Sequence, residues 1–145
     1  MDKQRLNTYF SKLQISGDEK VYIVVRLPAK AVMAAAGVVA EIAEPFSSVI
    51  VDRDEVSLVI PEEAFDDFRA RLVGCEVGAI TYRLITFDVV LPLNLVGFMA
   101  AVSSVLAEGG ISIMAYAAFS RDHLLVPVDQ YEQAITLLEQ LKAGV

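Results

Sequence analysis

The segment NLVGFMAAVSSVLAEGGISIMAYAAFSRDHLLVPVD, residues 94–129, decides the fold of this 145-residue chain. Its first part places apolar side chains on one face of a helix, at intervals of three, four, seven and eleven residues from the first. These side chains are Leu95, Phe98, Met99, Val102 and Leu106. Gly109-Gly110 ends that helix. The apolar runs 111–119 and 123–126 flank the tight turn 120–122, and this pattern predicts an antiparallel hairpin.

The flanking sequence gives this segment a strand before it and a helix after it. Residues 80–91 read as the strand, and the apolar stripe of the last helix is Tyr131, Ile135, Leu138 and Leu141. The first half repeats the order: strand 21–27, alanine-rich helix 30–44, strands 46–51 and 55–60 around a polar turn, and a helix opened by Pro61.

One offset relates the two halves, because 122 − 55 = 67 links Glu55 with Asp122, and the same offset links Phe68 with Ile135. An internal duplication explains this offset most simply. The sequence therefore predicts an α+β fold of two tandem βαββαβ ferredoxin-like units, with antiparallel sheets and the helices on one face.

We expect three segments: an N-terminal helix over 1–16, a first unit over 17–81 and a second unit over 82–145. Asp2 is the expected cap of the N-terminal helix, and Leu6, Phe10 and Leu13 share one of its faces. The second unit lacks a strand after its last helix, since residues 142–145 are too few. An element from elsewhere in the chain, or from a partner, must fill that open sheet edge.

Composition restricts the class of protein. The net charge is −7, and the 12 basic residues are scattered, which argues against nucleic-acid binding. The longest apolar stretch, residues 31–43, is too short to span a membrane. The single cysteine, Cys75, excludes an internal disulfide and suits a cytoplasmic location. A mean hydropathy of +0.52 is high for so small a chain, and we expect part of its surface to close against a second copy in a homodimer.

No residue pattern predicts a catalytic centre, a metal site or a cofactor. The only histidine, His123, follows Asp122 in an expected strand, where adjacent side chains point to opposite faces, so the two should not meet. Asp52, Asp54 and Glu55 lack the spacing of a calcium loop and read as a solvated turn. Cys75 reads as an inert thiol. Arg83 has two readings, a buried ion-pair partner or an anchor for an anion.

Residues 82–141 resemble an ACT domain, especially those of the CASTOR-like proteins with two ACT domains. The resemblance rests on Leu95-Val96-Gly97 at the strand-to-helix bend, on residues 106–113 and on residues 119–126. In the first half, residues 46–51 and 54–59 are similar to the corresponding phrases of the family. Such domains bind amino acids or related ligands at domain or subunit interfaces and regulate another activity.

The resemblance implies a ligand site made of Asn94, Leu95, Val96, Gly97, Ala118, Phe119 and Asp122. Without a Cβ, Gly97 would let backbone amides approach a ligand carboxylate. The Asp122 carboxylate would pair with an α-amino group. Two simpler readings stay open: Gly97 permits a tight turn, and Asp122 bonds its own backbone.

The chain departs from the family pattern at three places. Val89-Val90 stands for Gly-Pro, Pro92 for a common Asp, and Val96 for Thr, which makes the site more apolar. From the duplicated unit, the Gly97 bend and Asp122 we nevertheless expect a sensor that binds an amino-acid-type ligand at an ACT–ACT interface. The alternative is a dimerisation or protein-interaction module that has lost its ligand. An enzyme on this scaffold is a third class, which the missing acid–base constellation disfavours.

Overall fold

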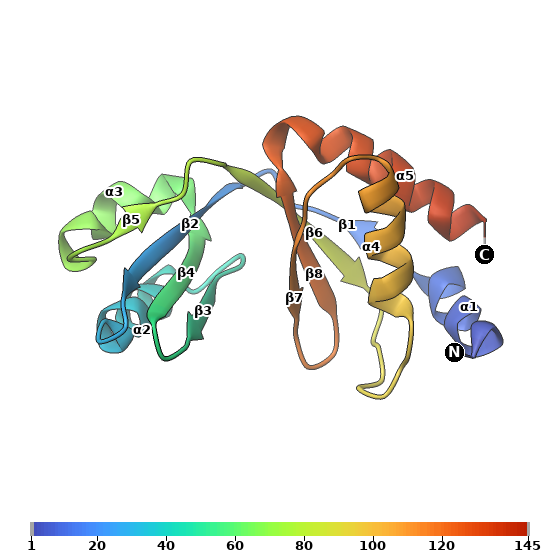
Figure 1. Cartoon of the computed structure of the whole chain (residues 1–145), viewed down its shortest axis with the longest axis horizontal. Coiled ribbons are helices and arrows are strands. Elements are labelled where there is room, and N and C mark those ends of the chain that lie inside the picture. Colours follow the sequence, from blue (N-terminus) through green and yellow to red (C-terminus); the bar gives the residue numbers. More distant parts are fainter. Residues whose placement is uncertain (1, 145) are drawn as a thin grey trace. The chain divides into compact units, whose positions relative to one another are not determined.

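The computed structural model describes residues 2–144, and they divide into two compact units (Figure 1). Lys20–Tyr82 forms one unit, which we call the continuous unit. Residues 2–19 and 83–144 together form the other, which we call the split unit. Each unit has a hydrophobic core of its own.

The continuous unit contains a four-stranded antiparallel arrangement in the order β3-β4-β2-β5. Its central pair is in register from Tyr22 opposite Pro61 to Pro28 opposite Glu55. The helix α2 covers this sheet through Ala35 and Val38, which are fully buried. In chain order its elements are β2 (Val21–Pro28), α2 (Val32–Ile42), β3 (Ser48–Val51), β4 (Glu55–Pro61), α3 (Phe65–Phe68) and β5 (Glu76–Val77).

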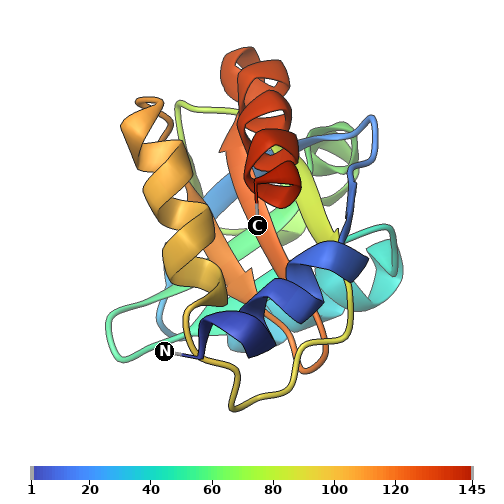
Figure 2. The ribbon, with the colours of Figure 1, turned by 90° about the vertical axis from the view of Figure 1, so that its right-hand side faces the viewer.

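The split unit has the equivalent order β7-β8-β6-β1. In Figure 2 its three helices lie on the same side of its strands. Its core includes side chains of all three helices, among them Phe10, Val102 and Leu138. In chain order its elements are α1 (Lys3–Lys12), β1 (Gln14–Ser16), β6 (Tyr82–Asp88), α4 (Phe98–Glu108), β7 (Met114–Ala117), β8 (Asp122–Pro127) and α5 (Tyr131–Ala143).

The open edge that the sequence leaves after the last helix is filled from the same chain. Strand β1 pairs antiparallel with β6, from Gln14 opposite Asp88 to Ser16 opposite Thr86. The helix before it is capped as expected, because the Asp2 carboxylate accepts a hydrogen bond of 3.0 Å from the backbone amide of Arg5. Residues 2–19 thus pack with residues 83–144 in the split unit, since Leu6, Phe10 and Leu13 are buried in its core.

Most element boundaries differ from the sequence expectation by a few residues, and three of these differences have a clear local reason. Helix α4 begins at Phe98 because Gly97 has φ 98° and lies outside the helix. Strand β7 begins only at Met114, since the amide of Ile111 is bound to the carbonyl of Leu106 in the cap that ends α4. Helix α3 has only four residues, between short 3₁₀ turns.

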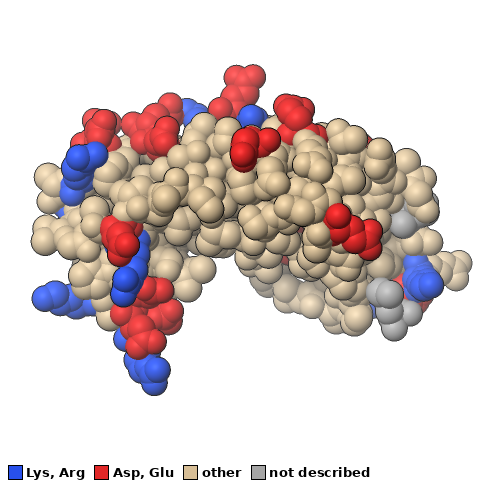
Figure 3. All heavy atoms as spheres, turned by 45° about the horizontal axis from the view of Figure 1, so that its top comes forward, with Lys and Arg blue, Asp and Glu red and all other residues tan. Residues whose placement is uncertain are grey.

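Basic residues are scattered over the face drawn in Figure 3, as they are along the sequence. On the face drawn in Figure 3, Lys and Arg lie among Asp and Glu and gather in no patch of their own. None of the helices in residues 2–144 has the length and apolar character needed to cross a bilayer.

Candidate functional site

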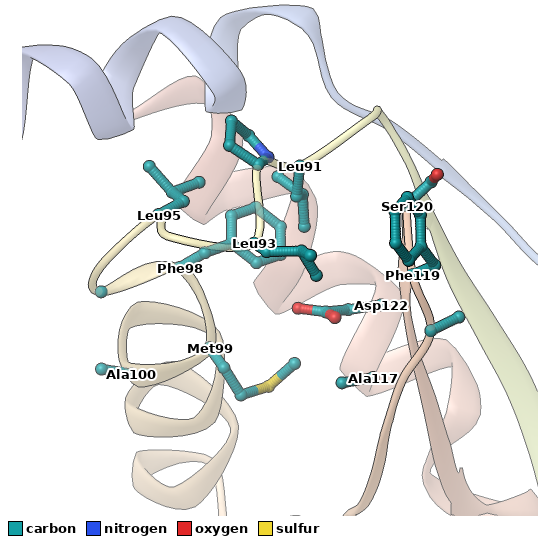
Figure 4. Close-up of a pocket in the computed structure, with 13 residues that line it drawn as sticks. Leu91, Leu93, Leu95, Phe98, Met99, Ala100, Ala117, Phe119, Ser120 and Asp122 are labelled. Atoms are coloured by element: carbon teal, nitrogen blue, oxygen red, sulfur yellow. The ribbon is translucent and has the colours of Figure 1, made fainter.

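A cavity of about 240 Å³ lies within the split unit, beside the start of α4 (Figure 4). Three segments form its walls: the loop between β6 and α4, the first turn of α4, and the hairpin that joins β7 to β8. Most of the described side chains that line it are apolar, and its polar surface comes from backbone groups, Ser120 and one ionisable side chain. The lining residues are Leu91, Pro92, Leu93, Leu95, Gly97, Phe98, Met99, Ala100, Ala117, Ala118, Phe119, Ser120 and Asp122.

Gly97 creates the bend that brings the loop into α4. Its φ of 98° lies in the left-handed region, which costs about 1–2 kcal/mol for a residue with a Cβ. The glycine is thus required by the turn, and it also lines the cavity. Both readings of Gly97 therefore fit the same backbone geometry.

The N-terminus of α4 presents unused backbone donors at this cavity. The first intrahelical bond runs from the amide of Ala101 to the carbonyl of Gly97. The amides of Phe98, Met99 and Ala100 precede that bond and have no intrahelical acceptor, and no side chain caps this helix. A helix start with free amides attracts an anionic group, through these donors and the positive end of the helix dipole.

Asp122 approaches from the opposite wall. It is the first residue of β8, and its carboxylate points into the hollow towards the side of Phe98 and Met99 (Figure 4). Within residues 2–144 no hydrogen bond to this carboxylate forms, so it does not serve its own turn. The turn is closed instead by the amide of Ala118, which donates to the carbonyl of Arg121. Burial raises the pKa of Asp122, and the neighbouring His123 partly offsets this rise.

Backbone and ionic contacts join the loop to the hairpin. The amide of Leu91 donates to the carbonyl of Ser120 over 2.8 Å. At the end of β6, Asp88 Oδ1 lies 2.8 Å from Arg121 Nε in the turn. The two walls of the cavity are thus connected at one end.

Five of the seven residues expected from the sequence lie together in this cavity: Leu95, Gly97, Ala118, Phe119 and Asp122. Asn94 and Val96 do not line it. The Asn94 side chain accepts a hydrogen bond from Arg5, and Val96 borders a separate hollow beside α1. The sequence could not reveal these directions, because nothing in the pattern of this loop separates Asn94 and Val96 from Leu95, which lines both hollows.

Sequence reasoning missed the apolar walls formed by Leu91, Leu93, Met99 and Ala100. For Met99 a signal existed, because a residue in the first turn of a helix after a glycine bend must lie near that bend. For Leu91 and Leu93 there was none, since the nine-residue loop 89–97 has no periodic pattern that orients its side chains.

The other chemically notable residues lie outside the cavity lining. His123 Nδ1 is 2.9 Å from Thr86 Oγ1, and burial lowers the pKa of His123. Arg83 donates to the carbonyl of Asp18 and stacks on Tyr131, with 3.9 Å from its guanidinium carbon to the ring centre. Among residues 2–144 no three His, Cys, Asp or Glu side chains lie close enough to hold a metal ion.

The turn of the continuous unit is held by its own backbone. The carboxylate of Asp52 accepts hydrogen bonds from the amides of Asp54 and Glu55, at 2.8 and 2.9 Å. Such bonds are typical of a turn and use the oxygen that a cation would need.

Comparison with known proteins supports the fold. Residues 79–140 match the family model of the ACT domain, which is fewer than half of the 145 residues. No curated protein matches the chain. Residues 79–140 lie almost wholly in the split unit.

Solved structures resemble most of the chain. Protein VC0802 from Vibrio cholerae has a TM-score of 0.74 at 21% identity, with 97% of this chain and 98% of that chain covered. Protein Atu0741 from Agobacterium tumefaciens has a TM-score of 0.69 at 23% identity, with 90% and 89% covered. The ligand-free regulatory subunit of aspartate kinase from Thermus thermophilus has a TM-score of 0.67 at 15% identity, with 89% and 98% covered. At these identities the likeness establishes the fold.

Proposed function

We propose that this chain is a regulatory protein of two ACT-like units, whose split unit binds a small amino-acid-type ligand. The observation that carries the proposal is the pairing of opposite polar groups across one small cavity. Free amides at the start of α4 suit a carboxylate, and the carboxylate of Asp122 suits an ammonium group. The ACT match over residues 79–140 supports the same assignment.

The rest of the cavity favours a ligand with an apolar side chain. Leu91, Leu93 and Met99 are among its walls, and of the described residues that line it Asp122 alone has an ionisable side chain. A second charge on the ligand would lose its hydration here without gaining a partner, which is costly. An aliphatic or aromatic amino acid therefore fits better than arginine or lysine.

The continuous unit is proposed as a degenerate ACT-like unit without this ligand. It repeats the strand order of the split unit, but only residues 29–31 connect its first strand to α2. Ala31 caps α2 with an ordinary negative φ, so the chain makes no glycine bend there. A loop of three residues cannot form the wall that 89–97 forms in the split unit.

We further propose that a second copy of the chain closes the ligand site, which makes the protein a homodimer. Leu93 and Phe119 line the cavity, yet 76% and 80% of their surfaces remain exposed. Val96 and Val90 in the same region are also exposed. Apolar side chains gathered in this way favour contact with another protein surface. A ligand between two copies could then stabilise their association and transmit a signal.

A thermal-shift measurement on the full chain with each of the 20 amino acids tests the ligand. At about 100 times its dissociation constant, a ligand should stabilise by ~2.7 kcal/mol and raise the midpoint by about 5–10 °C. The strongest hit is then compared with its decarboxylated amine and its N-acetyl derivative. Loss of the response with both analogues supports a site that binds the carboxylate at α4 and the ammonium group at Asp122. An unchanged midpoint across the whole panel rejects this site.

The second candidate is an interaction module that pairs without any ligand. The exposed Leu93 and Phe119 support this reading as well, because they can pack on a partner with the cavity empty. Light scattering after size exclusion distinguishes the two. A stable dimer without any response to the amino-acid panel favours the interaction module, and a dimer strengthened by one amino acid favours the sensor.

A further inference from the structure

The loop that forms one wall of the cavity has a second face, against the N-terminal helix. Leu95 lines the cavity, and it also lines a separate hollow of about 150 Å³ whose other walls are Asp2, Arg5 and Val96. The loop is therefore one residue thick at this point, with the cavity on one side and α1 on the other. A displacement of the loop changes both spaces together.

Two contacts of different kinds hold α1 against this wall. The Phe10 ring stacks on the Phe98 ring at 4.9 Å between centroids and 22° between planes, with Phe10 buried and Phe98 the first residue of α4. Nearer the start of α1, the Arg5 guanidinium donates to Asn94 Oδ1 in the loop over 3.0 Å, in an exposed hydrogen bond. The stack fixes one end of α1 at the helix start, and the hydrogen bond fixes the loop.

We infer that Arg5 and Phe10 are positioning residues of the ligand site. Through them the N-terminal helix α1 sets the geometry of the loop 89–97, which forms one wall of the cavity. The consequence of this inference, that α1 controls ligand affinity, rests on the proposed function. Its test does not, because the test uses the ligand-free protein. Phe98 is held from two sides, since Phe87 also meets its ring edge-on at 5.4 Å. Asn94, by contrast, accepts the hydrogen bond that Arg5 donates from α1. The loop is therefore the part of the site that depends most on α1.

Arg5 reaches the loop without being needed for the fold. Its side chain is exposed, and the cap of α1 uses the backbone amide of Arg5 with the Asp2 carboxylate. Alanine at this position keeps that amide and favours helix. An Arg5→Ala change therefore removes the contact to Asn94 and leaves α1 in place.

Amide hydrogen exchange of the ligand-free full chain tests the inference. Loss of one such hydrogen bond should speed local opening about 2- to 10-fold. In Arg5→Ala we expect this acceleration at the amide of Leu95, which donates to the carbonyl of Pro92 within the loop, with the thermal midpoint and the exchange of β4 and β8 unchanged. The matched control is Lys12→Ala, which removes a cation from the last turn of the same helix. It should exchange as the wild type does in the loop.

The variants Asn94→Ala and Phe10→Leu complete the test. If Arg5 acts through Asn94, the double variant Arg5→Ala/Asn94→Ala exchanges like either single variant, because both remove one bond. Phe10→Leu keeps an apolar side chain in the core and should speed exchange at the amide of Ala101, which donates to the carbonyl of Gly97 in the first turn of α4. The inference is overturned if the loop of Arg5→Ala exchanges as in the wild type, or if acceleration spreads evenly over the split unit. An amino-acid panel without any response would reject the ligand while leaving this result intact.

Discussion

Opposing influences act on the ionisable groups at the start of β8. Burial raises the pKa of Asp122 because the charged carboxylate loses hydration, and it lowers the pKa of His123 because the charged imidazole does. Each side chain offsets part of the other's shift. These two neighbours therefore resist being charged, although one faces the cavity and the other contacts Thr86.

Replacement of Asp122 by Asn should separate binding from stability. Since burial already disfavours the charge, we expect Asp122→Asn to change the unfolding free energy by less than ~1 kcal/mol. A lost charge-assisted bond to an ammonium is worth ~1.5–3 kcal/mol, which is about 10- to 100-fold in affinity. Titration with the best amino acid of the panel measures this. The matched control is Glu55→Gln at the related position of the continuous unit, and an equal loss there would contradict the assignment.

The pH dependence of stability should carry the signature of His123. Its pKa in the folded protein lies below the usual value of about 6.5, so the unfolded chain binds the proton more readily. Its contribution to stability is then present above about 6.5 and is lost as the pH falls through the lowered pKa. Urea unfolding between pH 7 and 5.5 measures this decline. In His123→Gln the decline should flatten, whereas an identical slope in both proteins would rule out this residue as its source.

At the scale of elements, Gly97 at the start of α4 has two roles: it makes the bend before the helix, and it lines the cavity. Gly97→Ala should cost about 1–2 kcal/mol, because φ 98° is strained for any side chain, and should lower the thermal midpoint by about 2–8 °C. Gly144→Ala is the control, since Gly144 follows α5 with an ordinary φ of −88°. A Gly97→Ala protein as stable as that control would mean that the bend adopts another conformation in solution.

The sequence predicted helix α4 and the neighbouring hairpin well, but it did not predict how the side chains of the loop before α4 are oriented. The apolar intervals from Leu95 to Leu106 identified α4, because one helix face must be buried whatever packs on it. The turn 120–122 likewise identified the β7–β8 hairpin, since its signal is local. The orientation of Asn94 and Val96 escaped prediction, because a loop without periodicity takes its side-chain directions from the elements around it.

The edge strand β1 shows the same limit more clearly. The segment 14–16 is too short to show a strand pattern in the sequence. It forms a strand because it pairs with an edge of β6 that would otherwise be open. That edge is formed by residues about 70 positions later in the chain, as the pairing of Gln14 with Asp88 shows. The sequence showed that an edge was missing, but only the packing of Leu6, Phe10 and Leu13 decided which segment fills it.

At the scale of the whole molecule, the two units differ in how many segments of the chain they need: one is formed by a single segment and the other by two. The continuous unit has all four of its strands and its core between Lys20 and Tyr82. We therefore expect residues 20–82, produced alone, to show the far-ultraviolet spectrum and the cooperative unfolding of a folded α+β domain. Residues 83–145 lack β1 and the buried face of α1, and alone they should expose core surface and aggregate.

Restoring the missing segment should rescue the split unit. In a permuted chain, a flexible linker joins the end of residues 83–145 to the start of residues 1–19, which supplies α1 and β1. The linker can be made long enough to connect the two ends, because the entropic cost of closing a loop grows slowly with its length. A permuted chain carrying Phe10→Ala is the matched control, because removal of this buried ring should cost ~3–5 kcal/mol. Folding of the first chain and failure of the second would show that the N-terminal segment completes a domain formed almost entirely by the other end of the sequence. Folding of 83–145 without any added segment would mean that β1 is dispensable and that the edge of β6 tolerates solvent.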